Sequence, residues 1–158
     1  MRAAVLTVSD GVVAGTRDDR SGEVLAERAA ATGFDVVERR AVADEHDGIV
    51  AALRALCDEA DLVLTTGGTG FAPRDVTPEA TAQVVERPTP GLDEAMREVS
   101  RRASPHGLLS RGASGIAGRT LVVNLPGSPR ACEECFDAIS GALRHGVELL
   151  LDQPTEHP

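Results

Sequence analysis

The chain has 158 residues, of which 42% are hydrophobic and 26% charged, a mix typical of one compact globular domain. Its formal net charge of −9, with three Phe as the only aromatic residues, disfavours binding to nucleic acid or to an anionic membrane surface. All 16 basic residues are arginine, which excludes Schiff-base and P-loop lysines, and three cysteines disfavour a secreted disulfide framework.

In the first half of the chain, apolar runs alternate with helical stripes. Strands are predicted at residues 3–8, 34–42 and 61–66, with a loop over 12–22 and helices over 23–32 and 44–60. This alternation predicts a parallel sheet with crossover helices. No run reaches the roughly 18 apolar residues of a membrane helix, and no processing signal follows Met1, so we expect a cytoplasmic protein without a membrane partner.

The second half continues the same pattern. Its predicted elements are a glycine-rich loop at 67–75, a helix with Thr77 as N-cap and Pro78 at its first position, a helix from 92 to before Pro105, a small hairpin near residues 113–124 around Gly118, and a last helix at 128–151. The polar tail at 152–158 is expected to be disordered. We therefore predict a single domain over residues 1–151.

Two glycine-rich turns follow predicted strands. The first is the sequence TTGGTG at 65–70, and in open α/β sheets ligands bind beyond the carboxyl ends of strands. Glycines there let backbone N–H groups approach an anionic ligand, although a tight strand-to-helix connection without a ligand explains them equally well. The second is NLPGSP at 124–129, where Ser128 is the expected N-cap of the last helix and the free N–H groups of that helix make an anion site. Both turns are able to converge on one crevice.

Two aspartates stand out near these turns. Asp44 follows the second predicted strand and is explained most simply as the N-cap of the next helix. Asp75 lies in the glycine-rich loop with no evident local structural task, because Thr77 already serves as a cap. A carboxylate beside bound phosphate needs a bridging cation, and Mg²⁺ is commonly held by one or two carboxylates plus phosphate oxygens. The pattern favours a Mg-nucleotide or Mg-phosphate site.

Other reactive residue types give weaker signals. Cys132 and Cys135 have a C-x-x-C spacing, but both fall on the apolar stripe of the last helix and are interpreted as buried structural cysteines. Arg74, Arg111 and Arg130 adjoin the predicted loops, either as anion clamps or as solvated surface residues.

Motifs spread over nearly the whole chain resemble those of the MoaB/Mog family of molybdenum-cofactor biosynthesis proteins, which includes the gephyrin G domain. The matching stretches are TVSD at 7–10, residues 18–22, Asp44-Glu45, TTGGTGFAPRDVTPEAT at 65–81, Pro90-Gly91 with Arg97, LSR at 109–111 with Gly115, and NLPGSP at 124–129. The chain passes from that last turn directly into the last helix, without the insertion of the longer Mog branch.

The resemblance implies a three-layer α/β fold with a mostly parallel central sheet and helices on both faces, assembled as a homotrimer. It also implies transfer of AMP from Mg-ATP to the terminal phosphate of molybdopterin, with release of pyrophosphate. By the same resemblance, the pterin phosphate is held by Gly67, Gly68, Thr69, Gly70, Pro126, Gly127 and Ser128, the crevice is lined by Ser9, Asp10 and Ser110, and the two required aspartates, also Mg²⁺ ligands, are Asp44 and Asp75. This role replaces the N-cap interpretation of Asp44.

Two alternatives remain open at this point. One is a non-catalytic molybdopterin-binding or oligomeric scaffold of the MoaB type, and the other is a nucleotide phosphatase with the same kind of sheet. By the same resemblance, a molybdate-inserting enzyme that acts downstream is the expected protein partner.

Overall fold

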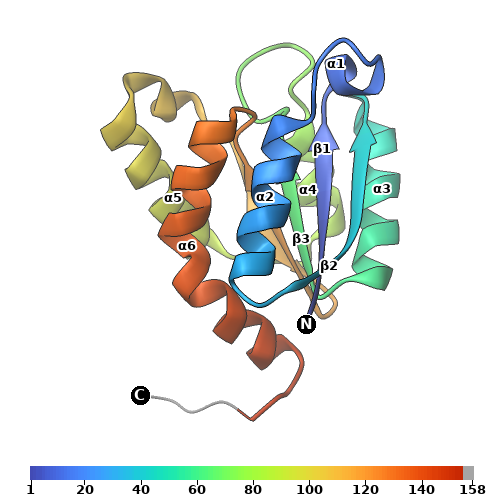
Figure 1. Ribbon diagram of the computed structural model, residues 1–158, viewed down its shortest axis with the longest axis vertical. Helices are drawn as coiled ribbons and strands as arrows, with labels where there is room; N and C mark the ends of the chain where they lie inside the picture. Colours follow the sequence, from blue (N-terminus) through green and yellow to red (C-terminus); the bar gives the residue numbers. More distant parts are fainter. Residues whose placement is uncertain (155–158) are drawn as a thin grey trace.

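Six strands form one sheet in a computed structural model that describes residues 1–154 (Figure 1). The spatial order is β2-β1-β3-β6-β5-β4. The first four of these run parallel, whereas β5 is antiparallel to β6 and β4 is antiparallel to β5. This confirms the mostly parallel sheet and the small hairpin. The strands are β1 (Arg2–Val8), β2 (Asp35–Val42), β3 (Leu62–Thr66), β4 (Arg87–Pro88), β5 (Ser114–Ala117) and β6 (Thr120–Leu125).

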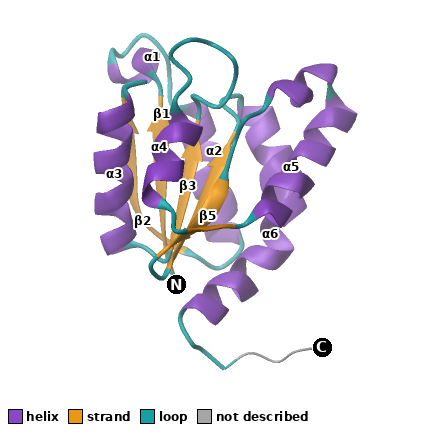
Figure 2. Cartoon of the chain, turned by 180° about the vertical axis from the view of Figure 1, so that it is seen from behind, coloured by secondary structure: helices purple, strands orange, loops and turns teal. Residues whose placement is uncertain are grey.

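Helices cover both faces of the sheet, which confirms the three-layer α/β architecture. In Figure 1, α2 and α6 lie in front of the strands with α5 beside α6, and Figure 2 shows α3 and α4 on the opposite face. The helices are α1 (Asp10–Val13), α2 (Arg20–Ala31), α3 (His46–Glu59), α4 (Thr77–Val84), α5 (Pro90–Ala103), the 3-10 helix η1 (Pro105–Leu109) and α6 (Pro129–Leu150). None of the helices within residues 1–154 is long and apolar enough to cross a bilayer.

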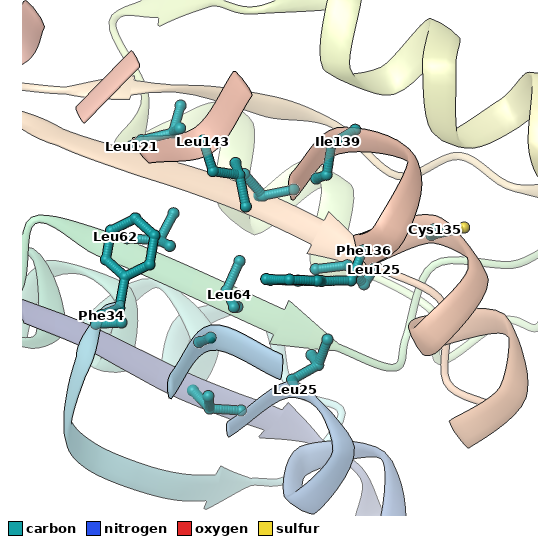
Figure 3. Packing of buried hydrophobic residues seen from close by; sticks show 14 of the residues in the cluster. Leu25, Phe34, Leu62, Leu64, Leu121, Leu125, Cys135, Phe136, Ile139 and Leu143 are labelled. Atoms are coloured by element: carbon teal, nitrogen blue, oxygen red, sulfur yellow. The ribbon is translucent and has the colours of Figure 1, made fainter. Parts of the chain in front are cut away.

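The central strands are buried on both faces because each side of the sheet has its own apolar core. Along β1, Ala3 and Val5 belong to the core beneath α2, α5 and α6, whereas Ala4 and Leu6 belong to the core beneath α3 and α4. This follows from the alternation of side chains along a strand. Phe136 of α6 is fully buried in the first core, where Figure 3 shows it beside leucines of the sheet. The stripe predicted for the last helix is therefore confirmed.

Several predicted boundaries were wrong because side chains cap the helices at other positions. The predicted loop at 12–22 holds only for 14–19: α1 begins after Ser9, whose Oγ accepts a hydrogen bond from the Val12 N–H, and α2 begins after Asp19, whose Oδ1 accepts one from the Gly22 N–H. Short elements, β4 and η1, were missed, since two to five residues carry no periodicity.

The two other predicted caps also differ. Glu45, not Asp44, is the N-cap of α3, and Val76, not Thr77, is the N-cap of α4. At the end of the described chain, the N–H groups of Asp152 and Gln153 donate to the Leu149 and Glu148 oxygens of the last turn of α6. Residues 155–158 of the predicted tail lie outside the described residues.

Candidate active site

The carboxyl ends of the four parallel strands meet at one edge of the sheet, at the top of Figure 1. Ser9 follows β1, Asp44 follows β2, Gly67 follows β3 and Pro126 follows β6. The predicted site residues from these four segments are therefore brought to one place by the strand order. Asp61 precedes β3 and lies at the opposite edge of the sheet.

The first glycine turn has a backbone that other residues adopt poorly. Gly67 and Gly68 have φ of +95° and +63°. A Cβ at Gly67 would lie 2.2 Å from the Val8 carbonyl oxygen, and one at Gly68 would lie 2.3 Å from the Thr77 Oγ1. The turn itself therefore requires both glycines, whatever they bind.

All four carbonyls of Gly67–Gly70 accept hydrogen bonds from the protein. Thr77 donates from Oγ1 to the Gly67 oxygen at 2.9 Å and from its N–H to the Gly68 oxygen at 3.1 Å. Arg111 donates from its N–H to the Thr69 oxygen and from Nε to the Gly70 oxygen, both at 2.8 Å. With the acceptors of this turn occupied, its N–H groups are the backbone groups left for a ligand.

The second glycine turn touches the first. A Cβ at Gly127 would lie 3.4 Å from the Gly67 Cα. Ser128 is the N-cap of α6, as predicted, and its Oγ accepts a hydrogen bond from the Ala131 N–H at 3.2 Å. The expected convergence of the two turns is confirmed.

Two cavities open beside these turns. The Asp44 cavity, of 560 Å³, is also lined by Ser9 and Gly67. The Ser110 cavity, of 570 Å³, is also lined by Thr69, Gly70 and Pro126. They share four lining residues: Gly68, Asp75, Gly127 and Ser128. Asp75 and the two turns thus form the boundary between the cavities.

Asp10 and Asp44 hold each other in place. The Asp44 Oδ2 accepts a hydrogen bond from the Asp10 N–H at 2.8 Å, and the Asp10 Oδ1 accepts one from the Asp44 N–H at 3.0 Å. Asp75 has a local contact that the sequence did not indicate, because its Oδ2 accepts a hydrogen bond from the Ala72 N–H at 3.1 Å. Asp10 lies beside the Asp44 cavity rather than in its lining.

The arginines near the turns are already paired. Arg74 donates from Nε and Nη2 to the two oxygens of Asp10, at 2.6 and 2.9 Å. The hydrogen bond from Arg74, followed by that from the Asp44 N–H, lowers the pKa of the Asp10 carboxyl. Arg130 pairs with Glu134 one turn along α6, and Arg111 pairs with Glu79.

The two cysteines of α6 are buried, as predicted. Burial raises the pKa of Cys132 to about 12 and also raises that of Cys135, so both thiols stay protonated at neutral pH. Within residues 1–154 no three His, Cys, Asp or Glu side chains gather closely enough to hold a metal ion by themselves.

Residues 4–145 match a family described as "Probable molybdopterin binding domain". The chain belongs to this family, of which MoaB and Mog are members. Over 151 residues it is 42% identical to the molybdopterin adenylyltransferase of Helicobacter pylori strain J99, a match that covers 93% of this chain and 86% of the relative. It is also 46% identical to the molybdenum cofactor synthesis protein cinnamon of Drosophila melanogaster, over 94% of this chain. The chain spans 25% of that longer protein.

A solved MoaB/Mog structure has the same fold. The molybdopterin biosynthesis enzyme MoaB from Thermus thermophilus superposes with a TM-score of 0.91 at 43% identity, covering 98% of this chain and 99% of that one.

Some cavity residues of this MoaB/Mog chain were not singled out from the sequence. Arg17 and Arg20 line the Asp44 cavity, and Ser100, Ser104 and His106 line the Ser110 cavity. The residue 18–22 motif was a pointer to the first group. For the second group no sequence signal was available, because it depends on how η1 folds back over α5.

Proposed function

We propose that this protein is a molybdopterin adenylyltransferase of molybdenum cofactor biosynthesis. One observation carries the proposal: two cavities of 560 and 570 Å³ meet at a shared boundary formed by Asp75 and both glycine turns. Such a boundary suits two substrates that exchange a group where they touch. The similarity to molybdopterin adenylyltransferases over most of the chain supports this chemistry.

In the proposed reaction, an oxygen of the terminal phosphate of molybdopterin attacks the α-phosphorus of ATP. A new bond forms between that oxygen and the α-phosphorus. The bond between the α-phosphorus and the oxygen that bridges it to the β-phosphorus breaks, and pyrophosphate leaves with that electron pair. The reaction depends on positioning and charge neutralisation rather than on a covalent nucleophile. The residue types of the site agree with that requirement, since the described cavities contain glycine turns, carboxylates and arginines.

The backbone is the proposed phosphate-binding element. The carbonyl oxygens of Gly67–Gly70 accept hydrogen bonds from Thr77 and Arg111. These oxygens are therefore already paired and do not present free acceptors to a bound phosphate. Ser128 begins the 22-residue helix α6, whose first N–H groups carry a partial positive charge. A chain of net charge −9 binds two polyanions in this way through local groups.

The carboxylates of Asp44 and Asp75 fit a Mg²⁺ ion that is also bound by phosphate. Both line the Asp44 cavity, and each accepts a backbone hydrogen bond through Oδ2, at 2.8 Å for Asp44 and 3.1 Å for Asp75. Two carboxylates with phosphate oxygens are an ordinary Mg²⁺ environment. When bound, Mg²⁺ neutralises phosphate charge. We propose that Asp44 and Asp75 hold it and so orient the phosphates of ATP.

The test is to incubate the purified protein with molybdopterin, ATP and Mg²⁺ and to measure adenylylated pterin and pyrophosphate. Equal amounts of the two products are expected, together with their loss when Mg²⁺ is chelated. Pterin binding without transfer would instead support the scaffold, and pyrophosphate or phosphate release without pterin would support a phosphatase. Either result overturns the transferase.

The homotrimer, the cytoplasmic location and a molybdate-inserting enzyme that consumes the product remain proposals drawn from the resemblance and the sequence. Light scattering tests the first, because a trimer has three times the chain mass of 16.5 kDa.

A further inference from the structure

Arg111 is the most heavily bonded charged residue at the site. It lies between η1 and β5, directly after Ser110 of the Ser110 cavity. Its N–H donates to the Thr69 oxygen at 2.8 Å, its Nε to the Gly70 oxygen at 2.8 Å, and its Nη2 to the Asp75 oxygen at 2.6 Å. One residue therefore binds three carbonyls of the β3–α4 loop.

The two side-chain bonds of Arg111 join the two ends of an exposed loop. Residues 71–74 between Gly70 and Asp75 are exposed, with Phe71 67% exposed. Inside the loop, the Asp75 N–H donates to the Ala72 oxygen at 2.9 Å. Two arginines link this loop to the rest of the domain. The Arg74–Asp10 pair is 57% and 46% exposed, whereas the Arg111 side chain is 34% exposed and bonds the backbone at both ends of the loop. Segments with few buried contacts open easily, so the loop depends on these links.

Glu79 in the first turn of α4 completes the arrangement. It forms an ion pair with the Arg111 guanidinium, which is 34% exposed. The hydrogen bond from Arg111 lowers the pKa of Glu79. The planar guanidinium thus binds two carbonyls and a carboxylate at once, which a lysine ammonium does not reproduce.

We propose that Arg111 is a positioning residue of the active site rather than an anion clamp. It fixes the Asp75 carboxylate at the boundary of the two cavities, and it joins the wall that carries Asp75 to the wall that carries Ser110. This inference rests on the proposed transferase function. It differs from both alternatives that the sequence left open for Arg111, an anion clamp and a solvated surface residue, because the donors of Arg111 are directed to the loop.

The test compares Arg111→Ala with a matched arginine variant, Arg119→Ala, in the β5–β6 turn at the opposite edge of the sheet. Misplacement of a reacting group by about 1 Å costs on the order of 100-fold in rate, so kcat of Arg111→Ala is expected to fall about 100-fold. The KM for ATP is expected to change less than about threefold, because no phosphate ligand is lost. Added guanidinium ion is expected to raise the kcat of Arg111→Ala about tenfold and to leave the kcat of Asp75→Asn unchanged.

Unchanged kcat in Arg111→Ala, or a raised KM for ATP with unchanged kcat, would overturn the inference, since the latter marks a substrate ligand. Hydrogen exchange at the Ala72 and Asp75 amides provides a measure that does not depend on activity, and faster exchange is expected in Arg111→Ala. If wild-type protein transfers no AMP, the proposed function fails, while exchange still decides whether Arg111 holds the loop. If Arg111→Ala does not fold, Arg111→Lys takes its place, with the same expected direction and the same overturning result.

Discussion

The two glycine turns meet at the same edge of the sheet but are held in different ways. The second turn is short and is anchored from within the core, where the Pro126 oxygen accepts hydrogen bonds from the Thr66 Oγ1 and the Cys132 Sγ, both at 2.8 Å. Thr66 and Cys132 are fully buried. The first turn leads into a longer exposed loop. The carbonyl oxygens of this turn accept hydrogen bonds from Thr77 and Arg111.

Under the proposed function, this difference separates substrate binding from chemistry. The second turn provides backbone groups fixed by buried neighbours and by the start of α6. The first provides Asp75, but depends on a side chain 36 residues further along the chain to place it. We therefore expect loss of Asp75 or of its contacts to change kcat most, and loss of the buried anchors of the second turn to change stability and substrate binding.

The largest expected effect is from Asp75→Asn, which removes a charge at the boundary of the cavities. Adenylylation is expected to fall about 1000-fold, because charge-neutralising groups at a reacting phosphate contribute on this scale. Thermal unfolding and pterin binding of Asp75→Asn should stay near those of wild type. The control is Asp58→Asn, at an exposed position near the end of α3, and its adenylylation rate should equal that of wild type. A fully active Asp75→Asn enzyme would contradict the site assignment.

Next in size is the contrast between Gly68→Ala and Gly127→Ala. At Gly68 the new Cβ meets the Thr77 Oγ1 at 2.3 Å and the φ of +63° is strained, so we expect a loss of about 2–4 kcal/mol in unfolding free energy. At Gly127 the nearest atom is 3.4 Å away, and a loss below about 1 kcal/mol is expected. Urea unfolding measures both, and equal losses would show that the two turns are equally constrained.

A smaller effect is expected from Cys132→Ala, which removes one of the two hydrogen bonds to the Pro126 oxygen. The loss of the bond and of the buried sulfur should lower the unfolding free energy by about 1–2 kcal/mol. Cys132→Ser keeps a donor, so its pterin affinity should exceed that of Cys132→Ala. Identical affinities in the two variants would argue that the second turn does not depend on this anchor.

The smallest effect on stability is expected from Arg74→Ala. The Arg74–Asp10 pair is half exposed, with side-chain exposures of 57% and 46%, and such pairs contribute little. No measurable shift in the urea midpoint is expected. A several-fold rise in the KM for ATP would show that Arg74 leaves Asp10 for a phosphate, whereas an unchanged KM would limit it to the Asp10 contact.

The site was only partly predictable. The glycine turns, Asp44, Asp75 and Ser128 were recognisable because short motifs carry them. The N-cap interpretation of Asp44 was wrong, since its carboxylate accepts from the Asp10 N–H, 34 residues away. The assignment of Thr77 as a cap was wrong for a similar reason, because its hydroxyl bonds to the Gly67 oxygen. A side chain that is able to cap a helix is equally able to bind a distant backbone group, and only the folded chain decides between them.

By itself the sequence determined the alternation of strands and helices, the apolar stripe of α6 and the positions where glycine is required, because these depend on periodicity and local backbone conformation. Tertiary structure alone decided the division of the site into two cavities, the reciprocal hydrogen bonds of Asp10 and Asp44, and the contacts of Arg111. Those features join segments that meet only because β1, β2, β3 and β6 lie side by side and parallel, so that their carboxyl ends share one edge.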